Sequence, residues 1–517
     1  MIRLLLATAT AAGFEIDSRT PFYAPQPFTL FLDGKMVRRE DRNVFTLFGL
    51  QPESEHTLRA VYEDGTEDEL SFATLSETMA VSVRDFGAVG DGVHDDTRAI
   101  QTAIYCLPEG GRLTFPEGTY LSFPIALKSH MTLEFQEGAV LLGSTEREKY
   151  PWIPGTVRDQ ATGEERAFGS FEGNEVAMYQ SLLFAEYAED ITIVGPGSVD
   201  GNAQNSDFWI DFNRFPYKRP RLMFFSRSRN IRVLGVKARN SASWQLHPYF
   251  SDNLDFIDVL VEAPKNSPNT DALDPESCDS VRIVGCTFSV GDDCIAIKSG
   301  KIEVGKKYKK PASNHEIRNC LMKFGHGAVT LGSEIGAGVR DLKVTQCLFK
   351  DTDRGLRIKT RRGRGKDCDI ERVTFDNIRM EGVVTPFVIN MWYNCVDPDK
   401  RSEYVWSREI LPVDERTPHF GQFIFRDITC VDAQAAACYI DGLPEAPIEE
   451  VVFDRVSVRF KEDAKPSMPI MENFARKCLR LGLYLENVRR VVLRSVEIDG
   501  AIGTPVVPKN CEEVVRE

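Results

Sequence analysis

The sequence predicts an all-β protein in which a small β-sandwich precedes a parallel β-helix. Two observations carry this prediction. A short strand-like unit recurs through most of the chain at intervals of 25 to 36 residues, and the first 78 residues carry separate short strands between turn signals. Repeats of 20 to 50 residues are typical of solenoids, and a unit this short, made almost wholly of strands, favours a β-helix over a propeller. A chain of 517 residues is too long for one ordinary core, which also favours a stack of coils.

The predicted sandwich occupies residues 1–78, and the predicted β-helix domain occupies residues 81–517. Alternating apolar residues separated by Asp-Gly and Gly/Pro turns predict the strands of the sandwich, which are Ile2–Ala9, Ala12–Asp17, Phe28–Leu32, Val44–Leu47, Thr57–Tyr62 and Leu70–Thr74. The stretches FTLFLDGK, NVFTLFGLQPESEHTLRAVYEDG and LSFAT resemble a fibronectin type III-like module. We expect this module to act as a spacer or as a wall beside the functional site.

The first residues allow two interpretations. Met1 to Asp17 contains one arginine, an apolar run and small residues, which loosely matches a signal peptide. Leu4, Leu6, Thr8 and Thr10 alternate, however, and the run continues into Phe14 without a polar break, which favours a first strand. A cytoplasmic location is therefore the favoured expectation, with a periplasmic or secreted protein as the alternative.

A short helix is predicted before the repeats begin. Ile100, Ala103 and Ile104 fall at helical spacing, and Asp95 or Asp96 is a suitable N-cap. A helix placed just before a long series of strands would cover the open end of the sheet. The glycine-rich run Gly87–Gly92 lacks a following Gly-Lys-Ser/Thr, so it does not predict a phosphate-binding loop.

The repeating unit is an Asn- or Asp-rich position, an alternating β-branched strand, a break and a second strand. Clear instances are Asp190–Val194, Asn230–Leu234, Asn253–Ile257, Asp279–Val284, His315–Asn319, Asp341–Val344 and Asp369–Val373, and weaker ones are Gln422–Val431, Ile448–Val458 and Val488–Ile498. We align Leu254, Val281, Ile317, Leu342 and Ile370 as equivalent positions. Three segments break the pattern and are predicted insertions: Tyr150–Glu175, Glu303–Ala312 and 396–420.

Composition and charge exclude several classes of protein. A net charge of −14 argues against general nucleic-acid binding. The chain lacks a run of about 18 apolar residues such as a membrane span needs. There is no Cys-x-x-Cys pair and there are only seven histidines, so no structural zinc site is expected. Cys286, Cys294, Cys320 and Cys347 lie within strand patterns and are predicted to be buried free thiols.

Three carboxylates form the first candidate site. Asp271 and Asp292 are 21 residues apart, about one short coil, so stacking would bring them together. A glycosidase needs two carboxyl groups beside the scissile bond, and crowding raises at least one pKa, as a general acid requires. Turn aspartates or a structural Asn/Asp ladder are the alternative. Asp293 joins Asp292 in one cleft only if Gly291 lies at a bend, because adjacent strand residues face opposite sides.

The next two coils add a histidine and a basic cluster. His326 lies between Gly325 and Gly327, where the backbone can approach a ligand, although a turn histidine is the ordinary explanation. Seven of the thirteen residues from 354 to 366 are Arg or Lys. Arg357 and Lys359 share one strand face and would clamp a carboxylate, whereas a solvated basic loop is the alternative. In a chain this acidic, the cluster favours an anionic substrate.

Four motifs in order resemble the polygalacturonase family, glycoside hydrolase family 28. They are SPNTDALDPESC, SVGDDCIAIKSG, FGHGAVTLGSE and DTDRGLRIKTRRGRG, and RPRLMFFSRSRNI, NSASWQLHP and PFVINMWYN extend the resemblance over roughly residues 81–395. The resemblance implies a right-handed parallel β-helix of the pectin-lyase-like type. It also implies hydrolysis of α-1,4-linked galacturonic acid with inversion, on an acidic polysaccharide or oligogalacturonide and without a cofactor or metal.

The same resemblance implies roles for individual residues. Asp292 would be the general acid, Asp271 and Asp293 would position and activate the water, and His326 would support the acid. Substrate contacts are implied for Arg357 and Lys359, which would hold a sugar carboxylate, and for Asn269 and Tyr393, which would shape the subsites.

Other activities on a similar scaffold stay open at this point. They are rhamnogalacturonan or xylogalacturonan hydrolysis, a pectate lyase that uses Ca²⁺, and a non-catalytic adhesin. An exo-acting hydrolase is the favoured form, because the N-terminal module and the insertions would wall off one end of an open groove.

Overall fold

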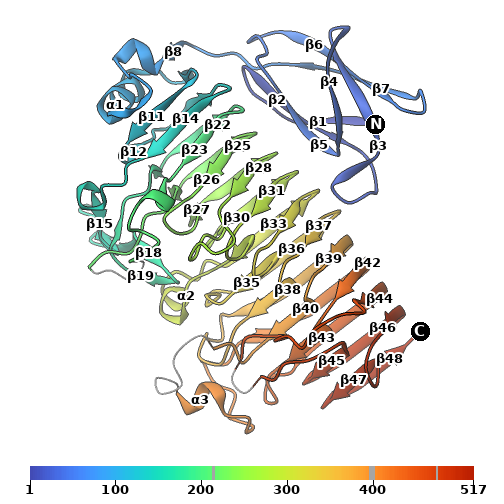
Figure 1. The fold of residues 1–517 in the computed structure, drawn as a ribbon. Coiled ribbons are helices and arrows are strands. Elements are labelled where there is room, and N and C mark those ends of the chain that lie inside the picture. Colours follow the sequence, from blue (N-terminus) through green and yellow to red (C-terminus); the bar gives the residue numbers. More distant parts are fainter. Residues whose placement is uncertain (212–215, 395–401, 473–474) are drawn as a thin grey trace.

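The computed structural model describes residues 1–211, 216–394, 402–472 and 475–517. It consists of an antiparallel β module followed by a long stack of parallel coils (Figure 1). All-β architecture with a parallel β-helix is therefore confirmed. The division into domains 1–78 and 81–517 stays a prediction, and it is consistent with the first seven strands forming sheets of their own.

The N-terminal module is a sandwich of two antiparallel sheets. Its strands are β1 (Ile2–Ala7), β2 (Ala11–Ile16), β3 (Tyr23–Leu32), β4 (Lys35–Arg42), β5 (Val44–Phe48), β6 (Glu55–Tyr62) and β7 (Glu67–Ala73). One sheet has the order β1-β2-β5 and the other β4-β3-β6-β7. Phe14, Phe28, Phe45 and Phe72 pack between them. Sequence patterns missed β4, because its residues are mostly charged and partly exposed and show no apolar alternation.

The predicted helix is α1 (Thr97–Cys106). Ile100, Ala103 and Ile104 are buried in the main core, so α1 covers the N-terminal end of the coil stack as expected. Asp96 is its N-cap by position, but its carboxylate accepts hydrogen bonds from the N–H groups of Val89 and Gly90 instead of capping the helix.

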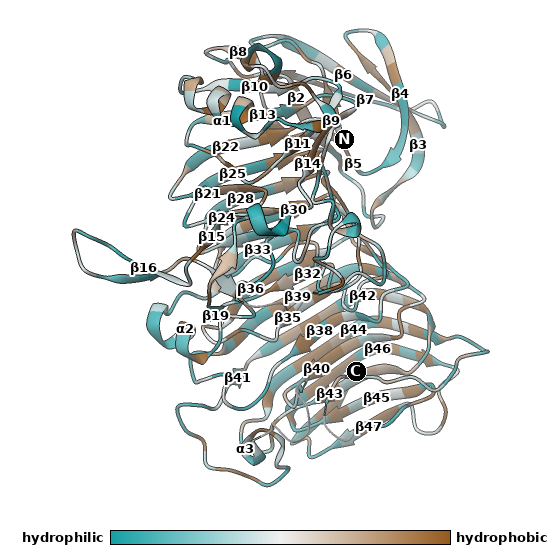
Figure 2. Ribbon diagram, turned by 60° about the vertical axis from the view of Figure 1, so that its left-hand side comes forward, coloured by the Kyte–Doolittle hydropathy of each residue, from teal (hydrophilic) through white to brown (hydrophobic). Residues whose placement is uncertain are grey.

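Two long parallel sheets form the β-helix. The larger contains β8 (Ala80–Ser82), β9 (Asp91–Asp95), β10 (Gly111–Phe115), β11 (Gly118–Ser122), β13 (Met131–Phe135), β14 (Ala139–Gly143), β22 (Glu189–Val194), β23 (Ser198–Asp200), β25 (Arg229–Leu234), β26 (Lys237–Arg239), β28 (Asp252–Ile257), β29 (Leu260–Glu262), β30 (Asp279–Val284), β31 (Thr287–Ser289), β33 (Ala312–Arg318), β34 (Leu321–Lys323), β36 (Val339–Thr345), β37 (Leu348–Lys350), β39 (Asp369–Glu381), β41 (His419–Phe420), β42 (Gln422–Ala433), β44 (Ile448–Phe460), β46 (Val488–Asp499) and β48 (Glu513–Arg516). Apolar residues dominate the strands, and polar residues collect in the connections (Figure 2).

The second sheet, here called the site sheet, positions the functional residues. Its strands are β12 (Ile125–Ala126), β21 (Leu183–Glu186), β24 (Met223–Ser226), β27 (Leu246–Tyr249), β32 (Ile295–Ile297), β35 (Val329–Gly332), β38 (Arg354–Lys359), β40 (Thr385–Asn390), β43 (Ala436–Asp441), β45 (Leu481–Glu486) and β47 (Val506–Lys509). Leu273 and Glu276 bridge β27 to β32 and make the ladder continuous.

In five of the repeats, an Asn or Asp near the start of the first strand has a backbone explanation. Asp190, Asn230, Asn253, Asn314 and Asp341 have φ between +55° and +57°, the left-handed region that Asn and Asp adopt more readily than other non-glycine residues. Their side chains also form a partial ladder, in which Asn230 Nδ2 donates to Asp190 Oδ1 at 3.0 Å. These positions are structural turns.

Two positions of the predicted repeat alignment are out of register. Leu254 lies opposite Val281 as predicted, but the next equivalent residues are His315, Leu342 and Val373, so Ile317 is displaced by two residues and Ile370 by three. A strand has a side-chain period of two, so the shift at Ile317 leaves the apolar pattern unchanged. Ile370 instead lies opposite Val339, another buried apolar residue.

The insertions add short elements beside the site sheet. They include η2 (Arg147–Lys149), β15 (Trp152–Ile153), β16 (Thr156–Arg158), β17 (Glu165–Ala167), β18 (Ser170–Phe171), β19 (Asn174–Glu175), β20 (Met178–Tyr179), η3 (Ala203–Asn205) and α2 (Ile302–Tyr308), and η1 (Val83–Phe86) precedes α1. The hydrophilic β16–β17 hairpin projects from the body (Figure 2). The third predicted insertion contains α3 (Glu403–Trp406), and its residues 396–401 lie outside the described part of the chain.

The N-terminal module packs against the large sheet. Ala11 and Val44 form an apolar cluster with Val194, Leu234 and Ile257. Two buried ion pairs join the two parts, Glu15 Oε1 to Arg318 Nε at 2.8 Å and Asp258 Oδ1 to Arg42 Nη1 at 2.7 Å.

These contacts correct the expected role of the module as a wall. They lie on the face opposite the site sheet, and among the described residues the module forms no hydrogen bond or ion pair with the candidate site.

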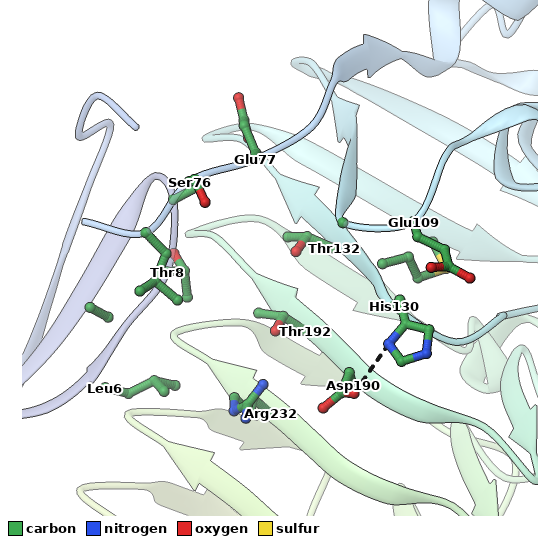
Figure 3. Close-up of a pocket in the computed structure, with 15 residues that line it drawn as sticks. Leu6, Thr8, Ser76, Glu77, Glu109, His130, Thr132, Asp190, Thr192 and Arg232 are labelled. Carbon is green, nitrogen blue, oxygen red and sulfur yellow. Dashed lines mark ion pairs between the residues drawn. The ribbon is translucent and has the colours of Figure 1, made fainter. Parts of the chain in front are cut away.

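A crevice of about 570 Å³ lies between the module and the first coils (Figure 3). Leu6 and Thr8 line one side, and His130, Asp190 and Arg232 line the other. His130 Nδ1 is 3.1 Å from Asp190 Oδ2, and both residues belong to left-handed turns. The crevice is remote from the carboxylate motifs, so it is not the predicted site.

In the described residues no helix combines the length and apolar character needed to cross a membrane. The four cysteines predicted to be buried thiols are buried and unpaired.

Candidate functional site

The ladder of the site sheet brings the predicted carboxylates together. Leu273 bridges to Ile295, which places Asp271 directly beside Asp293 on the neighbouring coil. Asp271, Asp292 and Asp293 each offer an oxygen within 4.8 Å of the others.

A bend at Gly291 resolves how two adjacent aspartates serve one site. The chain bends at Gly291 and Asp292, and the Asp293 N–H donates to Asp292 Oδ1 at 3.0 Å. The Asp292 side chain is 20% exposed, whereas that of Asp293 is fully buried. Asp292 therefore faces the opening and Asp293 lies beneath it. A Cβ at Gly291 would lie 2.7 Å from the Ser267 carbonyl oxygen, so only glycine fits there without a shift.

Both predicted clamp residues contact Asp293. Arg357 Nη1 is 2.7 Å from Oδ1, and Lys359 Nζ is 2.8 Å from Oδ2. Burial by itself would raise the pKa of Asp293, but these two cations hold that pKa well below its usual range. Asp293 is thus a fixed anion. Arg357 and Lys359 hold its carboxylate in place and also face the cleft.

The three carboxyl groups have different protonation preferences. Burial, followed by the charges of Asp292 and Asp274, raises the pKa of Asp271 well above its usual value. Burial also acts to raise the pKa of Asp292, but the hydrogen bond with His326 lowers it below normal. Of the three carboxyl groups, Asp271 therefore has the raised pKa, whereas the pKa values of Asp292 and Asp293 are lowered. Sequence reasoning expected crowding to raise one of these pKa values without saying which.

His326 lies on the next coil above Asp292. Its Nδ1 is 3.4 Å from Asp292 Oδ1, and its side chain is 50% exposed. The flanking glycines allow the coils to approach, because a Cβ at Gly325 would lie 2.7 Å from the Asp292 carbonyl oxygen. The hydrogen bond with Asp292 raises the pKa of His326 above its usual value.

This contact predicts a measurable titration. We expect the His326 ring to titrate above the ordinary histidine pKa of about 6.5 in an NMR pH series, because Asp292 stabilises the imidazolium. In Asp292→Asn the pKa of His326 should fall towards that value, while the six other histidines are unchanged. An unshifted His326 in the native protein would contradict the contact.

The two remaining predicted residues lie at the edges of the site. Asn269 Oδ1 accepts a 2.6 Å hydrogen bond from Arg219 Nη2, and its φ of +54° is left-handed. Tyr393 is 8% exposed, and the Lys359 Nζ lies 5.7 Å from its ring centroid. All eight predicted site residues are therefore assembled on neighbouring coils, and their roles stay predictions.

Sequence reasoning missed a buried charged network behind the carboxylates. Lys298 Nζ lies 3.4 Å from both Asp274 and Glu334, and 4.6 Å from the centroid of Trp244. Burial raises the pKa of Asp274 to about 8. The guanidinium of Arg221, which is also buried, stacks on Trp244 at 4.2 Å. Charged residues inside apolar strand patterns were the available signal, since such residues are rarely buried without a partner.

The insertion β15–β19 reaches the same network. Ser170 Oγ donates to Glu276 Oε2 at 3.1 Å, and Phe171 stacks on Trp244 with centroids 6.1 Å apart. The Lys301 N–H donates to the Gly173 carbonyl oxygen at 3.0 Å. This insertion therefore forms one wall of the site, as predicted for Tyr150–Glu175.

Some clusters have donor atoms close enough to bind a cation. They are Asp271, Asp292 and Asp293 at the site, and His130, Glu189 and Asp190 and also Asp369, Glu371 and His419 away from it. At the site, Arg357 and Lys359 already occupy both oxygens of Asp293, and their positive charges oppose a bound cation.

Comparison with known proteins agrees with this geometry. The family model described as glycosyl hydrolases family 28 matches residues 153–478, which include the eight site residues. A second model, rhamnogalacturonase A/epimerase, pectate lyase-like, matches residues 80–134, which hold the first coils and none of those residues.

Three similar proteins extend the comparison. A Vitis vinifera protein named "Probable polygalacturonase" is 30% identical over 415 residues, covering 77% of this chain and 78% of its own. The structure of a hyperthermoactive exopolygalacturonase from Thermotoga maritima has a TM-score of 0.66 at 26% identity, covering 82% of this chain and 92% of its own. A family 28 exopolygalacturonase from Yersinia enterocolitica has a TM-score of 0.71 at 20% identity, covering 99% and 98%, so the whole fold, N-terminal module included, has a counterpart.

The matched family model covers most of the coil stack and all of the assembled carboxylate, histidine and basic residues. The chain belongs to glycosyl hydrolases family 28.

Proposed function

We propose that the protein hydrolyses α-1,4-galacturonosidic bonds of polygalacturonate and its oligomers, with inversion and from a chain end. The observation that carries the proposal is the carboxylate cluster beside Arg357 and Lys359. Two or more carboxyl groups supply acid and base, and the adjacent cations suit a substrate that carries a carboxylate on every sugar. The similar proteins named exopolygalacturonase support the exo-acting form.

The residue roles follow from access and charge. Asp292 donates a proton to the leaving oxygen, because it is the carboxyl group that faces the opening, whereas Asp271 Oδ1 is buried without a hydrogen-bond partner. Because the pKa of Asp271 is raised and that of Asp292 is lowered in the ligand-free protein, this role requires a proton to pass from Asp271 to Asp292 when substrate binds, which leaves Asp271 as a base. Asp271 and Asp293 hold and activate the water. His326 supports the acid through its contact with Asp292. Arg357 and Lys359 also receive the substrate carboxylate, since Arg357 has donors beyond the one used by Asp293. Asn269 and Tyr393 shape the subsites.

Product analysis tests the proposal directly. Digestion of polygalacturonate is expected to accumulate mono- or digalacturonate, and NMR of the first products should show the β-anomer that inversion of an α-linkage produces. A ladder of intermediate oligomers would contradict exo action, and an initial α-anomer would contradict inversion.

The alternative activities predict different products. Rhamnogalacturonan or xylogalacturonan hydrolysis predicts a higher initial rate on those polymers than on polygalacturonate. A lyase predicts an ultraviolet-absorbing C4–C5 double bond and loss of activity with EDTA. We expect hydrolysis that survives EDTA and yields no such absorbance.

A further inference from the structure

We propose that the cleft of this enzyme binds only two or three galacturonate residues of its substrate, because it is closed along the site sheet in both directions. The inference rests on the proposed function and specifies how much of the substrate is bound. It depends on two coverings, the insertion β15–β19 on the N-terminal side and a segment on the C-terminal side. That segment, Met468–Glu472, is called the strap.

The outer face of the site sheet shows where a sugar chain would lie. The exposed side chains on this face are those of Asp292, His326, Asp353 and Lys359, which are 20%, 50%, 43% and 12% exposed. They lie on three successive coils, those of β32, β35 and β38. Three coils at the usual strand spacing of about 4.8 Å extend about 10 Å, which is roughly the length of two sugar rings.

On the N-terminal side the outer face is covered completely. His247 and Tyr249 on β27 point outward in the ladder but are fully buried. The hydrogen bond from Ser170 to Glu276 and the stacking of Phe171 on Trp244 anchor the insertion over this region. A sugar chain cannot continue along the sheet in this direction.

On the C-terminal side the strap crosses the next coil. Val388 and Asn390 of β40 are the neighbours of Arg357 and Lys359 in the ladder. Although they alternate with the core residues Phe387 and Ile389, they are only 2% and 1% exposed. Asn390 Nδ2 donates to the Met471 carbonyl oxygen at 2.9 Å, so the strap lies directly on this coil.

The strap is fixed along its length. Arg354 Nη2 donates to the Met468 carbonyl oxygen at 2.9 Å, and the Met471 sulfur is 3.7 Å from Arg357 Nη2. Ile470 is 1% exposed, and Arg408 pairs with Glu472 at 3.2 Å. The connection therefore forms an end wall next to the cation pair, and sugars beyond the second or third must leave the sheet.

The test is a chain-length series with the native protein. We expect kcat/KM to reach its maximum by trigalacturonate and to stay within about twofold up to the hexamer, because further sugars find no subsite. Polygalacturonate should be at least about tenfold slower per chain end, equivalent to 1.4 kcal/mol. A rise of more than about fivefold from trimer to hexamer would overturn the inference, since it would reveal further subsites.

Two variants connect this pattern to the strap. Replacing Met468–Glu472 by a Gly-Ser segment of equal length, or truncating only Met471 by Met471→Ala, should raise the hexamer-to-dimer ratio of kcat/KM at least about threefold. Met471→Ala serves if the replacement fails to fold, since Met471 is 45% exposed. The matched control is Met36→Ala, an exposed methionine of the N-terminal module, and it should leave the ratio unchanged.

Unchanged ratios in both strap variants would overturn the role of the strap. The native protein separates the two hypotheses: failure to cleave di- or trigalacturonate contradicts the proposed function, whereas cleavage with a steep chain-length dependence contradicts only the length limit.

Discussion

Asp292→Asn is expected to lower kcat on trigalacturonate by at least about 10²–10⁴-fold, the range typical of a lost general acid. Asn has nearly the same shape, but its amide cannot deliver a proton to the leaving oxygen. KM should change little, because Asp292 is only one of several groups that line the opening, and a fall in kcat with constant KM indicates an interaction made in the transition state.

A matched control separates the chemistry from a general effect of charge. Asp33→Asn removes an exposed carboxylate of the N-terminal module, at a left-handed φ of +51° that Asn also adopts. Its kinetics should equal those of the native enzyme. If Asp292→Asn kept more than about a tenth of the native kcat, general acid catalysis by Asp292 would be wrong.

Arg357→Met is expected to reduce the free energy of unfolding by about 3–5 kcal/mol, because it leaves the fully buried charge of Asp293 with Lys359 alone. Urea denaturation at pH 7 measures this loss. The depressed pKa of Asp293 means that the native pair contributes stability above the unfolded pKa of about 3.9, and this contribution is lost as the pH falls through the folded pKa.

A double-mutant cycle identifies the cause of that loss. Asp293→Asn in the Arg357→Met background should recover part of the stability, since it removes the uncompensated charge, with a coupling energy of about 0.5–3 kcal/mol. Arg340→Met is the surface control. Arg340 is 45% exposed and pairs with Asp369 at 2.9 Å, so its loss should cost about 0–1 kcal/mol. Additive effects of Arg357→Met and Asp293→Asn would contradict the coupling.

The periodicity of the sequence was sufficient to predict the β-helix architecture. An Asn or Asp at the start of many repeats indicates a left-handed turn, and the alternating strands indicate a stacked core, so the β-helix and its capping helix were predictable from local rules. β4 was not, because its stabilisation comes from pairing with β3 and not from its own polar sequence. The register error at Ile317 has a related cause, since a two-residue shift leaves the apolar pattern intact.

The sequence predicted which residues form the candidate site but not how they are arranged. Motif order identified Asp271, Asp292, Asp293, His326, Arg357 and Lys359, and the structure places them on adjacent coils. Sequence did not show that the cations would pair with Asp293, or that the Lys298 network would lie behind Asp274. Side-chain pairing between coils depends on the spacing and twist of the stack, which no single strand encodes.

The sequence by itself determined the solenoid, the acidic and basic residue types at the site and a substrate that carries negative charge. Tertiary structure alone decided which carboxyl group meets solvent, which one is a fixed anion and where the cleft ends. The N-terminal module, predicted as a wall, packs on the opposite face, while the insertion and the strap close the site sheet. The physical reason is that exposure, charge compensation and closure arise from contacts between coils distant in sequence, such as Asn390 with Met471.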